Sequence, residues 1–337
     1  MILYLHSNVS RADREDLLGL LARRGARVVE ATDPPGRVLA LVGEEGASDP
    51  AEWERHPAVE RVLLPATPYH LVHRDFHPER PGVRAGELLF GGEKVPVIAG
   101  PCSVEVEIDL VALARFLRDA GASALRGGAY KMRTSPYTFQ GLGEEGLARL
   151  AEARQATGLP VVTEVADPRD LDRVCRIADV VQVGARSAQN ISLLKEVGRA
   201  GKPVLLKRGM MSTLGEYLLA AEHVVAAGND RVILCERGIR TFEGATRNTL
   251  DLSAVPVLQR ESWLPVIVDP SHGTGHRRWV APMALAAVAA GADGLMIEVH
   301  PDPDAALSDG DQSLLPETFH ELMDRLRRVA SAVGREM

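Results

Sequence analysis

Residues 266–298 read VIVDPSHGTGHRRWVAPMALAAVAAGADGLMIE, a stretch in which two short apolar runs flank a helical segment. The runs Val266–Asp269 and Gly294–Glu298 lack polar alternation, which is typical of strands covered on both faces in a parallel sheet. The apolar segment between them, Trp279–Ala292, contains Pro282 and is too short to span a bilayer. The stretch therefore predicts one strand–helix–strand unit.

The same alternation recurs through the chain from residue 95 onward. Each further apolar run is followed by a segment with helical spacing, so the sequence contains eight strand–helix units. Eight such units in about 240 residues predict a (β/α)8 TIM barrel, and a doubly wound open sheet is the weaker alternative. The six further runs are Val95–Ala99, Ala124–Gly127, Pro160–Glu164, Val180–Val183, Pro203–Lys207 and Val232–Cys235.

The first 65 residues predict a separate small domain. Their elements follow the order β-α-β-β-α-β, which is typical of a ferredoxin-like α+β fold. Ser10 is expected to cap the first helix, because serine is a preferred N-cap residue. The expected elements are strand Met1–His6, a helix to Arg24, strands Arg27–Ala31 and Arg37–Val42, a helix from Pro50, and strand Val59–Leu64.

A proline-rich segment, residues 66–82, is expected to link this domain to the barrel of residues 83–337. Its histidines could suggest a metal site, but histidines in a polar linker are more often solvated. Just before the first barrel strand, Glu87–Lys94 predicts a hairpin around Gly91 and Gly92 that covers the barrel floor. The linker histidines are His70, His73 and His77.

Composition excludes several classes of protein. The 337 residues are 45% hydrophobic and carry a net charge of −7 without a block of Lys or Arg, which argues against a nucleic-acid or membrane-surface binder. The three cysteines are too few for a disulfide scaffold and suit a reducing cytosol. No signal peptide is expected at the amino end, so we expect a cytoplasmic protein.

Positive side chains follow many of the predicted strands. Because active sites of TIM barrels lie at the carboxyl ends of the strands, we expect these side chains to meet at one rim. Taken singly, each is more often a solvated surface charge, but together they predict binding of several phosphate or carboxylate groups. The six cations are Arg126, Lys131, Arg133, Arg186, Lys207 and Arg237.

A second group of side chains at strand ends offers ligands for a divalent transition metal. Cys102, His272, Glu298 and Asp309 supply a thiolate, an imidazole and two carboxylates, which suit Mn²⁺, Fe²⁺, Co²⁺ or Zn²⁺. The spacing alone does not establish this site, because Cys102 could be a buried thiol and His272 a base or a capping residue. Closure of the barrel would bring the first, seventh and eighth strands together.

The strand-end segments resemble the 3-deoxy-D-arabino-heptulosonate 7-phosphate (DAHP) synthase family, in the subgroup with an amino-terminal ferredoxin-like regulatory domain. The resemblance implies condensation of phosphoenolpyruvate with erythrose 4-phosphate, the first step of the shikimate pathway toward aromatic amino acids. The segments that carry it are AGPCSVE (99–105), LRGGAYKMRTSPYTFQG (125–141), VGAR (183–186), LLKRG (205–209), VILCERGIRTFE (232–243), DPSHGTG (269–275) and IEVHPDPDAALSDGDQSL (297–314).

The resemblance also implies roles for individual residues. Lys131 would donate a proton and Glu164 would orient the attacking water. One departure from the family is Met132, where a proline is usual, and residues 187–190 are slightly atypical. The metal ligands would be Cys102, His272, Glu298 and Asp309, the phosphoenolpyruvate contacts Arg126, Lys131, Arg186, Lys207 and Arg237, and the aldose phosphate contacts Arg133 and Thr134.

Further expectations concern regulation and the competing functions. The resemblance implies feedback inhibition by tyrosine or phenylalanine at the amino-terminal domain, and a homotetramer. The nearest rival is 3-deoxy-octulosonate 8-phosphate synthase, which uses arabinose 5-phosphate, and the segment from Lys131 to Thr134 favours the shorter sugar. A non-catalytic regulatory barrel would have lost a metal ligand or a rim cation, and none is missing.

Overall fold

The computed structural model describes residues 1–31, 37–42, 49–133 and 135–337. Contacts between Cα atoms divide the chain into two compact units. One comprises Met1–Pro81 with Arg260–Trp263, and the other comprises Gly82–Gln259 with Leu264–Met337. The two are described separately below.

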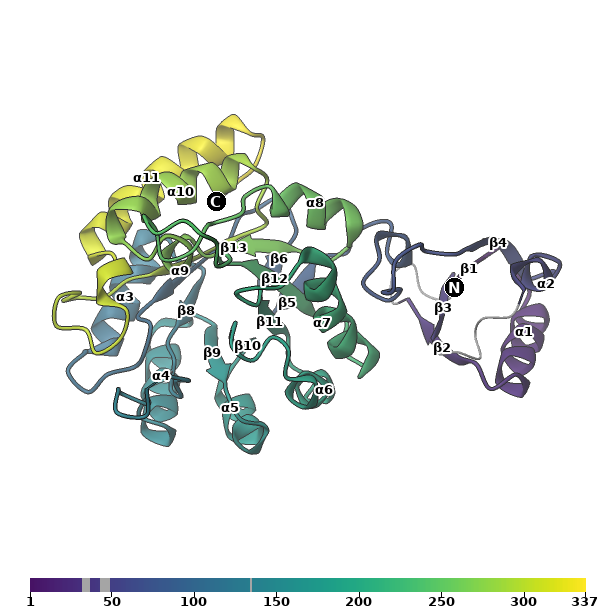
Figure 1. The fold of residues 1–337 in the computed structure, drawn as a ribbon, viewed down its shortest axis with the longest axis horizontal. Coiled ribbons are helices and arrows are strands. Elements are labelled where there is room, and N and C mark those ends of the chain that lie inside the picture. The colour runs from purple at the N-terminus through teal and green to yellow at the C-terminus, as the bar shows by residue number, and fades with distance from the viewer. Residues whose placement is uncertain (32–36, 43–48, 134) are drawn as a thin grey trace. The chain divides into compact units, whose positions relative to one another are not determined.

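The larger unit is a closed barrel of parallel strands, as the sequence predicts (Figure 1). The strands pair in the order β10-β11-β12-β13-β14-β7-β8-β9, and β9 returns to pair with β10. Runs of Val, Ile and Leu form these strands because both of their faces are covered. The bounds are β7 (Val97–Gly100), β8 (Ala124–Arg126), β9 (Val161–Val165), β10 (Val180–Val183), β11 (Val204–Lys207), β12 (Val232–Glu236), β13 (Val266–Val268) and β14 (Leu295–Glu298).

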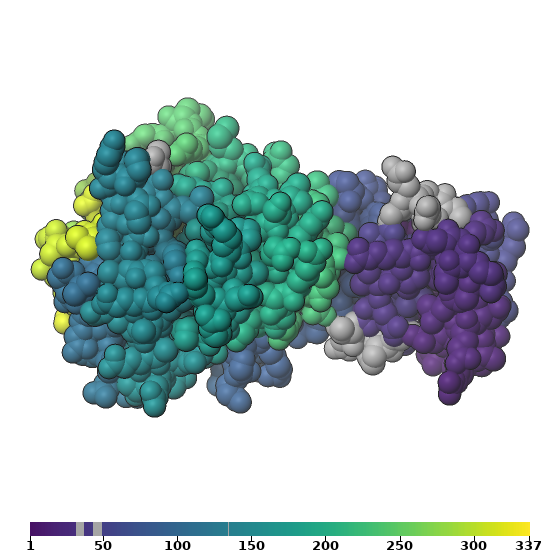
Figure 2. Space-filling model, turned by 90° about the horizontal axis from the view of Figure 1, so that it is seen from below, coloured from purple at the N-terminus to yellow at the C-terminus, as the bar shows by residue number. Residues whose placement is uncertain are grey.

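Helices follow every strand of the barrel and form an outer layer around it (Figure 1). In the space-filling view, the blue, teal and green segments of this unit pack against one another over the visible face (Figure 2). Their apolar stripes face the strands, and polar N-caps such as Asp109 and Thr213 accept bonds from free N–H groups of the first turn. The bounds are α3 (Leu110–Ala120), α4 (Glu144–Thr157), η3 (Pro168–Asp170), α5 (Leu171–Ile177), α6 (Ile191–Arg199), α7 (Leu214–Ala226), α8 (Ala254–Glu261), α9 (Pro270–Thr274), α10 (Arg277–Ala289), η4 (Gly310–Gln312) and α11 (Pro316–Ala332).

A two-stranded hairpin precedes the barrel, but the sequence misplaces its turn. The strands are β5 (Val83–Ala85) and β6 (Leu88–Phe90), so the expected turn at Gly91 and Gly92 is wrong. Gly86 makes the turn with a positive φ in open space, whereas a Cβ on Gly91 would lie 3.3 Å from Pro265. Phe90 belongs to the apolar cluster inside the barrel, and it lies beside Gly294 at the amino end of β14.

The smaller unit contains an antiparallel sheet and two helices. The sheet order is β2-β3-β1-β4, and Ser10 caps the first helix as predicted. Leu17 and Leu21 of α1 and Trp53 of α2 share one apolar core with β1 and β3. The bounds are β1 (Ile2–Leu5), α1 (Arg11–Arg23), β2 (Arg27–Glu30), β3 (Val38–Val42), α2 (Pro50–Glu54), β4 (Val59–Leu63) and η2 (Arg74–Phe76).

The segment from residue 66 to residue 81 contributes buried side chains to the smaller unit. Leu71, Val72 and Phe76 are buried. Trp263 is buried as well, and its Nε1 donates a hydrogen bond of 2.7 Å to the Leu71 carbonyl oxygen. This bond explains why residues 260–263 group with the amino-terminal part of the chain.

The apolar stretch that the sequence singles out around Pro282 forms α10, a helix of 13 residues with this proline inside it. Val280, Ala284 and Val288 of this helix are buried. Among the residues that the structure describes, no helix combines the length and the apolar character needed to cross a membrane.

Candidate active site

A pocket opens at the carboxyl ends of the barrel strands. Seven of the eight barrel strands, or the loops that follow them, contribute to its lining. Thr134, the second expected contact of the aldose phosphate, lies outside the described residues. The expected site residues in the lining are Arg126, Lys131, Arg133, Glu164, Arg186, Lys207, Arg237, His272 and Asp309, and the others are Met132, Gln182, Gly184, Ala185, Met210 and Arg247.

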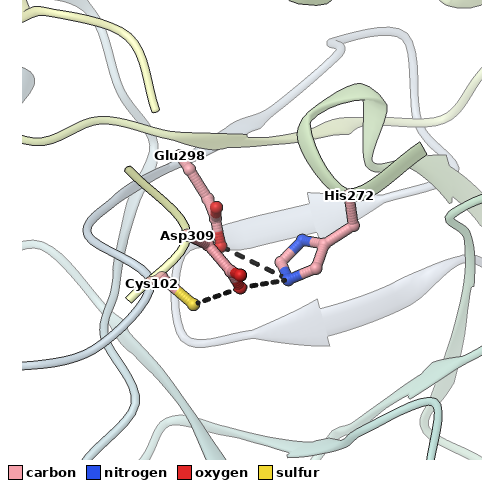
Figure 3. A group of neighbouring side chains, drawn as sticks. All are labelled: Cys102, His272, Glu298 and Asp309. Atoms are coloured by element: carbon pink, nitrogen blue, oxygen red, sulfur yellow. Dashed lines mark hydrogen bonds and ion pairs between the residues drawn. The ribbon is translucent and has the colours of Figure 1, made fainter. Parts of the chain in front are cut away.

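Four side chains with ligand atoms for a metal meet at this pocket (Figure 3). Cys102 follows β7, His272 lies in α9, Glu298 ends β14, and Asp309 lies in the loop after β14. One ligand atom from each lies within 4.8 Å of the others. His272 Nε2 is 3.4 Å from Glu298 Oε1 and 3.7 Å from Asp309 Oδ2, and Cys102 Sγ is 3.1 Å from the same aspartate oxygen.

The orientation of His272 is fixed from its other ring nitrogen. Asp269, the residue after β13, caps α9 and accepts bonds from the backbone N–H of His272 and from Nδ1, at 2.9 and 2.8 Å. This turns Nε2 toward the cluster, as a carboxylate does for a metal-bound histidine. Burial lowers the pKa of His272, so the ring is neutral at neutral pH and its Nε2 lone pair is available.

The chemistry of the other ligands also fits a cation. Glu298 Oε1 is completely buried and accepts no hydrogen bond within the described chain, although Arg126 Nη2 lies 3.1 Å away. Burial, with the nearby Glu298 carboxylate, raises the pKa of the Cys102 thiol to about 12. Its thiol donates to Asp309, and a bound divalent metal would replace that proton. The four residues therefore fit a divalent metal.

Two buried arginines in the pocket lack partners for part of their guanidinium groups. Arg126 Nε and Nη1 and Arg237 Nε are buried and make no hydrogen bond among the described residues. Burial lowers the pKa of Arg237, and it also opposes the charge on Arg126, but the acidic groups around Arg126, of which Glu298 contributes most, together outweigh burial and raise its pKa. Buried donors without acceptors cost free energy, so these groups point to an anionic ligand.

Lys131 and Glu164, the two residues expected to act in the chemistry, both line the pocket. Lys131 Nζ is 3.2 Å from Cys102 Sγ and 3.2 Å from the Cys102 carbonyl oxygen. Burial lowers the pKa of Lys131, but the acidic groups around it, which include Cys102, Glu164 and Glu298, together outweigh burial, so the pKa is raised and the ammonium keeps its proton at neutral pH. Glu164 Oε2 accepts a bond of 2.9 Å from Gln182 Nε2. A Cβ on Gly184 would lie 2.2 Å from Glu164 Oε1, so glycine makes room for this carboxylate.

The remaining expected contacts are less enclosed. Arg186 is exposed, and Arg133 is held by the Phe139 carbonyl oxygen at 3.1 Å and by Ser308 Oγ. The two departures from the family contact each other, because Ser187 Oγ donates a bond of 3.0 Å to Met132 Sδ. Met132 is thereby tied to the loop after β10.

Sequence reasoning missed three residues of this site. Arg247 lies in the loop between β12 and α8, far along the chain from any strand end, and no spacing rule identifies it. Gln182 is the third residue of β10, and its inward direction could have been read from the alternation along the strand. Ser308 donates to Cys102 Sγ at 3.2 Å, beside the aspartate that the resemblance singled out.

The closed barrel, the cationic pocket and the four-ligand cluster together define a TIM-barrel enzyme for small anionic substrates. Residues 78–333 match the DAHP synthetase I family, and the chain belongs to that family. A phospho-2-dehydro-3-deoxyheptonate aldolase of Thermotoga maritima is 51% identical over 297 residues, which is 88% of each chain.

One further match extends over nearly the whole chain, and another is a relative named for the competing activity. A crystal structure of phospho-2-dehydro-3-deoxyheptonate aldolase (DAHP synthase) from Thermotoga maritima matches with a TM-score of 0.79 at 46% identity, covering 99% of this chain and 98% of that one. A 2-dehydro-3-deoxyphosphooctonate aldolase of Syntrophobacter fumaroxidans is 38% identical over 254 residues, 70% of this chain and 87% of its own length.

Arg237 has no carboxylate partner and its Nε makes no hydrogen bond among the described residues, so we expect it to differ from its neighbour Arg208, which is equally buried. Arg208 pairs with Glu236 and Asp251 at 2.8 and 3.1 Å, so Arg208→Met should destabilise the protein by about 3–5 kcal/mol. Arg237→Met should cost less than about 1 kcal/mol, because it removes a buried charge without a carboxylate partner. Urea unfolding of both variants measures the difference.

Inorganic phosphate provides the second readout for the same pair. Phosphate should raise the unfolding midpoint of the wild-type protein, because it satisfies buried donors. The increase should be smaller in Arg237→Met. If both substitutions destabilise the protein equally, and phosphate raises the unfolding midpoint of Arg237→Met as much as that of the wild type, Arg237 does not bind an anion.

Proposed function

We propose that the chain condenses phosphoenolpyruvate with erythrose 4-phosphate to form DAHP and phosphate, the first step of the shikimate pathway. The observation that carries this proposal is a pocket lined by the six expected cations together with His272 and Asp309, two members of a four-residue cluster whose ligand atoms lie within 4.8 Å of one another. Family membership and the 51% identical Thermotoga relative support the same activity.

The cations match the charges of the two substrates. Phosphoenolpyruvate carries a phosphate and a carboxylate, and erythrose 4-phosphate carries a phosphate and an aldehyde. We assign the buried Arg126, Lys207 and Arg237, with Lys131 and Arg186, to phosphoenolpyruvate, because guanidinium groups bind phosphate and carboxylate in a bidentate manner. Arg133 and Thr134 are assigned to the phosphate of the aldose.

Cys102, His272, Glu298 and Asp309 would hold the divalent metal, whose identity among Mn²⁺, Fe²⁺, Co²⁺ and Zn²⁺ the donor set leaves open. When bound, the metal supplies Lewis-acid polarisation of a carbonyl oxygen, here that of the aldehyde. Asp269 contributes by holding His272 Nδ1, and Lys207 Nζ lies 2.6 Å from the same aspartate. The substrate contact Lys207 and the ligand His272 are thus positioned by one carboxylate.

Lys131 and Glu164 then act on the bond-forming step and on the addition of water. C3 of phosphoenolpyruvate forms the new bond to the aldehyde carbon, and Lys131 donates a proton to the alkoxide that results. Glu164, held by Gln182, orients water toward C2, where positive charge has developed. Water adds to C2 and passes one proton to Glu164, which balances the proton that Lys131 donated. The bond between C2 and the phosphate oxygen then breaks, the C2 hydroxyl becomes the ketone, and its proton leaves with the phosphate. One water is consumed for each phosphate released.

The nearest rival function is that of the 38% identical relative, a 2-dehydro-3-deoxyphosphooctonate aldolase. The acceptor sugar distinguishes the two functions. With phosphoenolpyruvate, the full-length protein should release phosphate at least about 100-fold faster with erythrose 4-phosphate than with arabinose 5-phosphate, compared as kcat/KM. Activity should vanish with EDTA and return with Mn²⁺. A preference for arabinose 5-phosphate would show that the rival function is the correct one. Full activity of Cys102→Ala in EDTA would show that the reaction does not need the metal.

The proposal includes a regulatory role for residues 1–65, joined through residues 66–82 to the catalytic barrel of residues 83–337. The element order β-α-β-β-α-β and the antiparallel sheet order β2-β3-β1-β4 support a ferredoxin-like module. Modules of this size often bind amino acids between copies, so tyrosine or phenylalanine is the proposed effector and a homotetramer the proposed assembly. An inert stabilising module is the alternative.

Removal of residues 1–65 tests this role. The truncated protein should keep its catalytic rate in the absence of effector, because the pocket is built from barrel residues. Inhibition of the full chain by tyrosine or phenylalanine should disappear in the truncated protein, as measured by phosphate release. Inhibition that persists after truncation would place the effector site in the barrel.

A further inference from the structure

A loop that the proposed mechanism does not use lies along the turn that carries His272. Arg247 N donates to the Thr274 carbonyl oxygen at 3.0 Å, and Asn248 N donates to that of Gly273 at 3.1 Å. The buried Asn248 also donates from Nδ2 to the His272 carbonyl oxygen at 2.8 Å. These bonds fix the backbone of the loop beside the ligand cluster.

The contact is close enough to require glycine on the opposite side. Gly275 has a φ of +74°, and a Cβ at this position would lie 2.2 Å from Arg247 Cβ. Any other residue would displace the loop or strain the turn. The Arg247 side chain therefore starts from a fixed point.

From this point Arg247 reaches two of the proposed metal ligands. Its Nη1 donates to Asp309 Oδ1 at 3.1 Å and to Gln312 Oε1 at 2.7 Å. The buried Gln312 donates in turn from Nε2 to Glu298 Oε2 at 2.7 Å. One guanidinium thus contacts Asp309 directly and Glu298 through Gln312.

The two oxygens of Asp309 have separate partners. Oδ1 faces Arg247, whereas Oδ2 is the oxygen that faces Cys102 and His272. The backbone of Asp309 has a φ of +55°, which a residue with a side chain adopts only at a cost. Arg247, Cys102 and His272, the partners of the two carboxylate oxygens, all lie outside the loop that carries Asp309.

The distribution of charge also connects Arg247 with Asp309. Each of the three ligands that can carry negative charge has a cation beside it: Lys131 lies 3.2 Å from Cys102 Sγ, Arg126 lies 3.1 Å from Glu298, and Arg247 lies 3.1 Å from Asp309. Lys131 and Arg126 have proposed roles in binding substrate. Arg247 has none in the reaction described above.

We propose that Arg247 is a positioning residue that holds Asp309 with Oδ2 turned toward the ligand cluster and steadies Glu298 through Gln312. The inference rests on the metal site of the proposed function. It assigns to this chain an outer partner for two ligands, of the kind whose loss typically weakens metal affinity 10- to 100-fold.

The test is Co²⁺ titration of the metal-free, full-length protein, followed by absorbance. Arg247→Gln should weaken Co²⁺ binding at least tenfold, because Asp309 loses the group that directs it. Arg240→Gln is the matched control, since Arg240 is an exposed arginine of the same loop, and it should bind Co²⁺ like the wild type. Equal or tighter binding by Arg247→Gln would overturn the inference.

A double-mutant cycle shows whether the effect passes through Asp309. Asp309→Asn should weaken Co²⁺ binding by itself, and adding Arg247→Gln should then cost less than threefold more. A full additional loss would contradict the proposal. If Arg247→Gln unfolds when free of metal, Gln312→Met is the alternative variant. It removes the link between Arg247 and Glu298 and should weaken Co²⁺ binding about tenfold.

Substrate kinetics separate this role from direct substrate binding, because Arg247 also lines the pocket. At saturating Co²⁺, the KM values of both substrates should stay within twofold of the wild type in Arg247→Gln. A tenfold rise in KM with unchanged Co²⁺ affinity would make Arg247 a substrate contact and overturn the proposal. Failure of the wild type to bind Co²⁺ would instead refute the proposed metal site.

Discussion

The site depends on cations that balance the negative charge of acidic side chains buried in one cluster. Glu298 and Cys102 are almost fully buried, and His272 and Asp309 lie beside them. Buried carboxylates are costly unless cations pair with them, and neighbouring strands and loops supply one cation for each acidic ligand. His272, the neutral member of the cluster, instead contacts the Asp269 carboxylate through its Nδ1. Arg126, one of these cations, and Arg237 have buried donors without partners among the described residues, and these donors make the pocket suited to phosphate and carboxylate groups.

Closure of the barrel makes this arrangement possible. The pairing of β14 with β7 places Glu298 opposite Gly100, two residues before Cys102. Gly100 has a φ of +146°, and a Cβ there would lie 2.2 Å from the Arg126 carbonyl oxygen, so glycine lets β7 and β8 approach closely. In an open sheet, β7 and β14 would not both be neighbours of this point. The ligand cluster thus follows from register and closure.

The sequence predicts the barrel well because continuous apolar runs mark strands that are buried on both faces. The strand expected at Val180–Val183 has these bounds in the structure, and the others differ by one or two residues at their ends. The sequence misplaces the hairpin turn because Gly86 and Gly91 both have a positive φ, and only their surroundings differ: a Cβ would meet open space at Gly86 but would lie 3.3 Å from Pro265 at Gly91. Arg247 could not be found because its place depends on how a long loop lies against the His272 turn. Strand ends can be read from a pattern, whereas loop contacts of this kind depend on the completed fold.

We propose that strands far apart in sequence build one metal site that includes the Cys102 sulfur. X-ray absorption of the full-length protein loaded with one equivalent of Zn²⁺ shows which atoms surround the metal. We expect one sulfur neighbour at about 2.3 Å and nitrogen or oxygen neighbours at about 2.0–2.2 Å. A metal surrounded only by nitrogen and oxygen atoms would contradict it, because the metal would then be bound without Cys102.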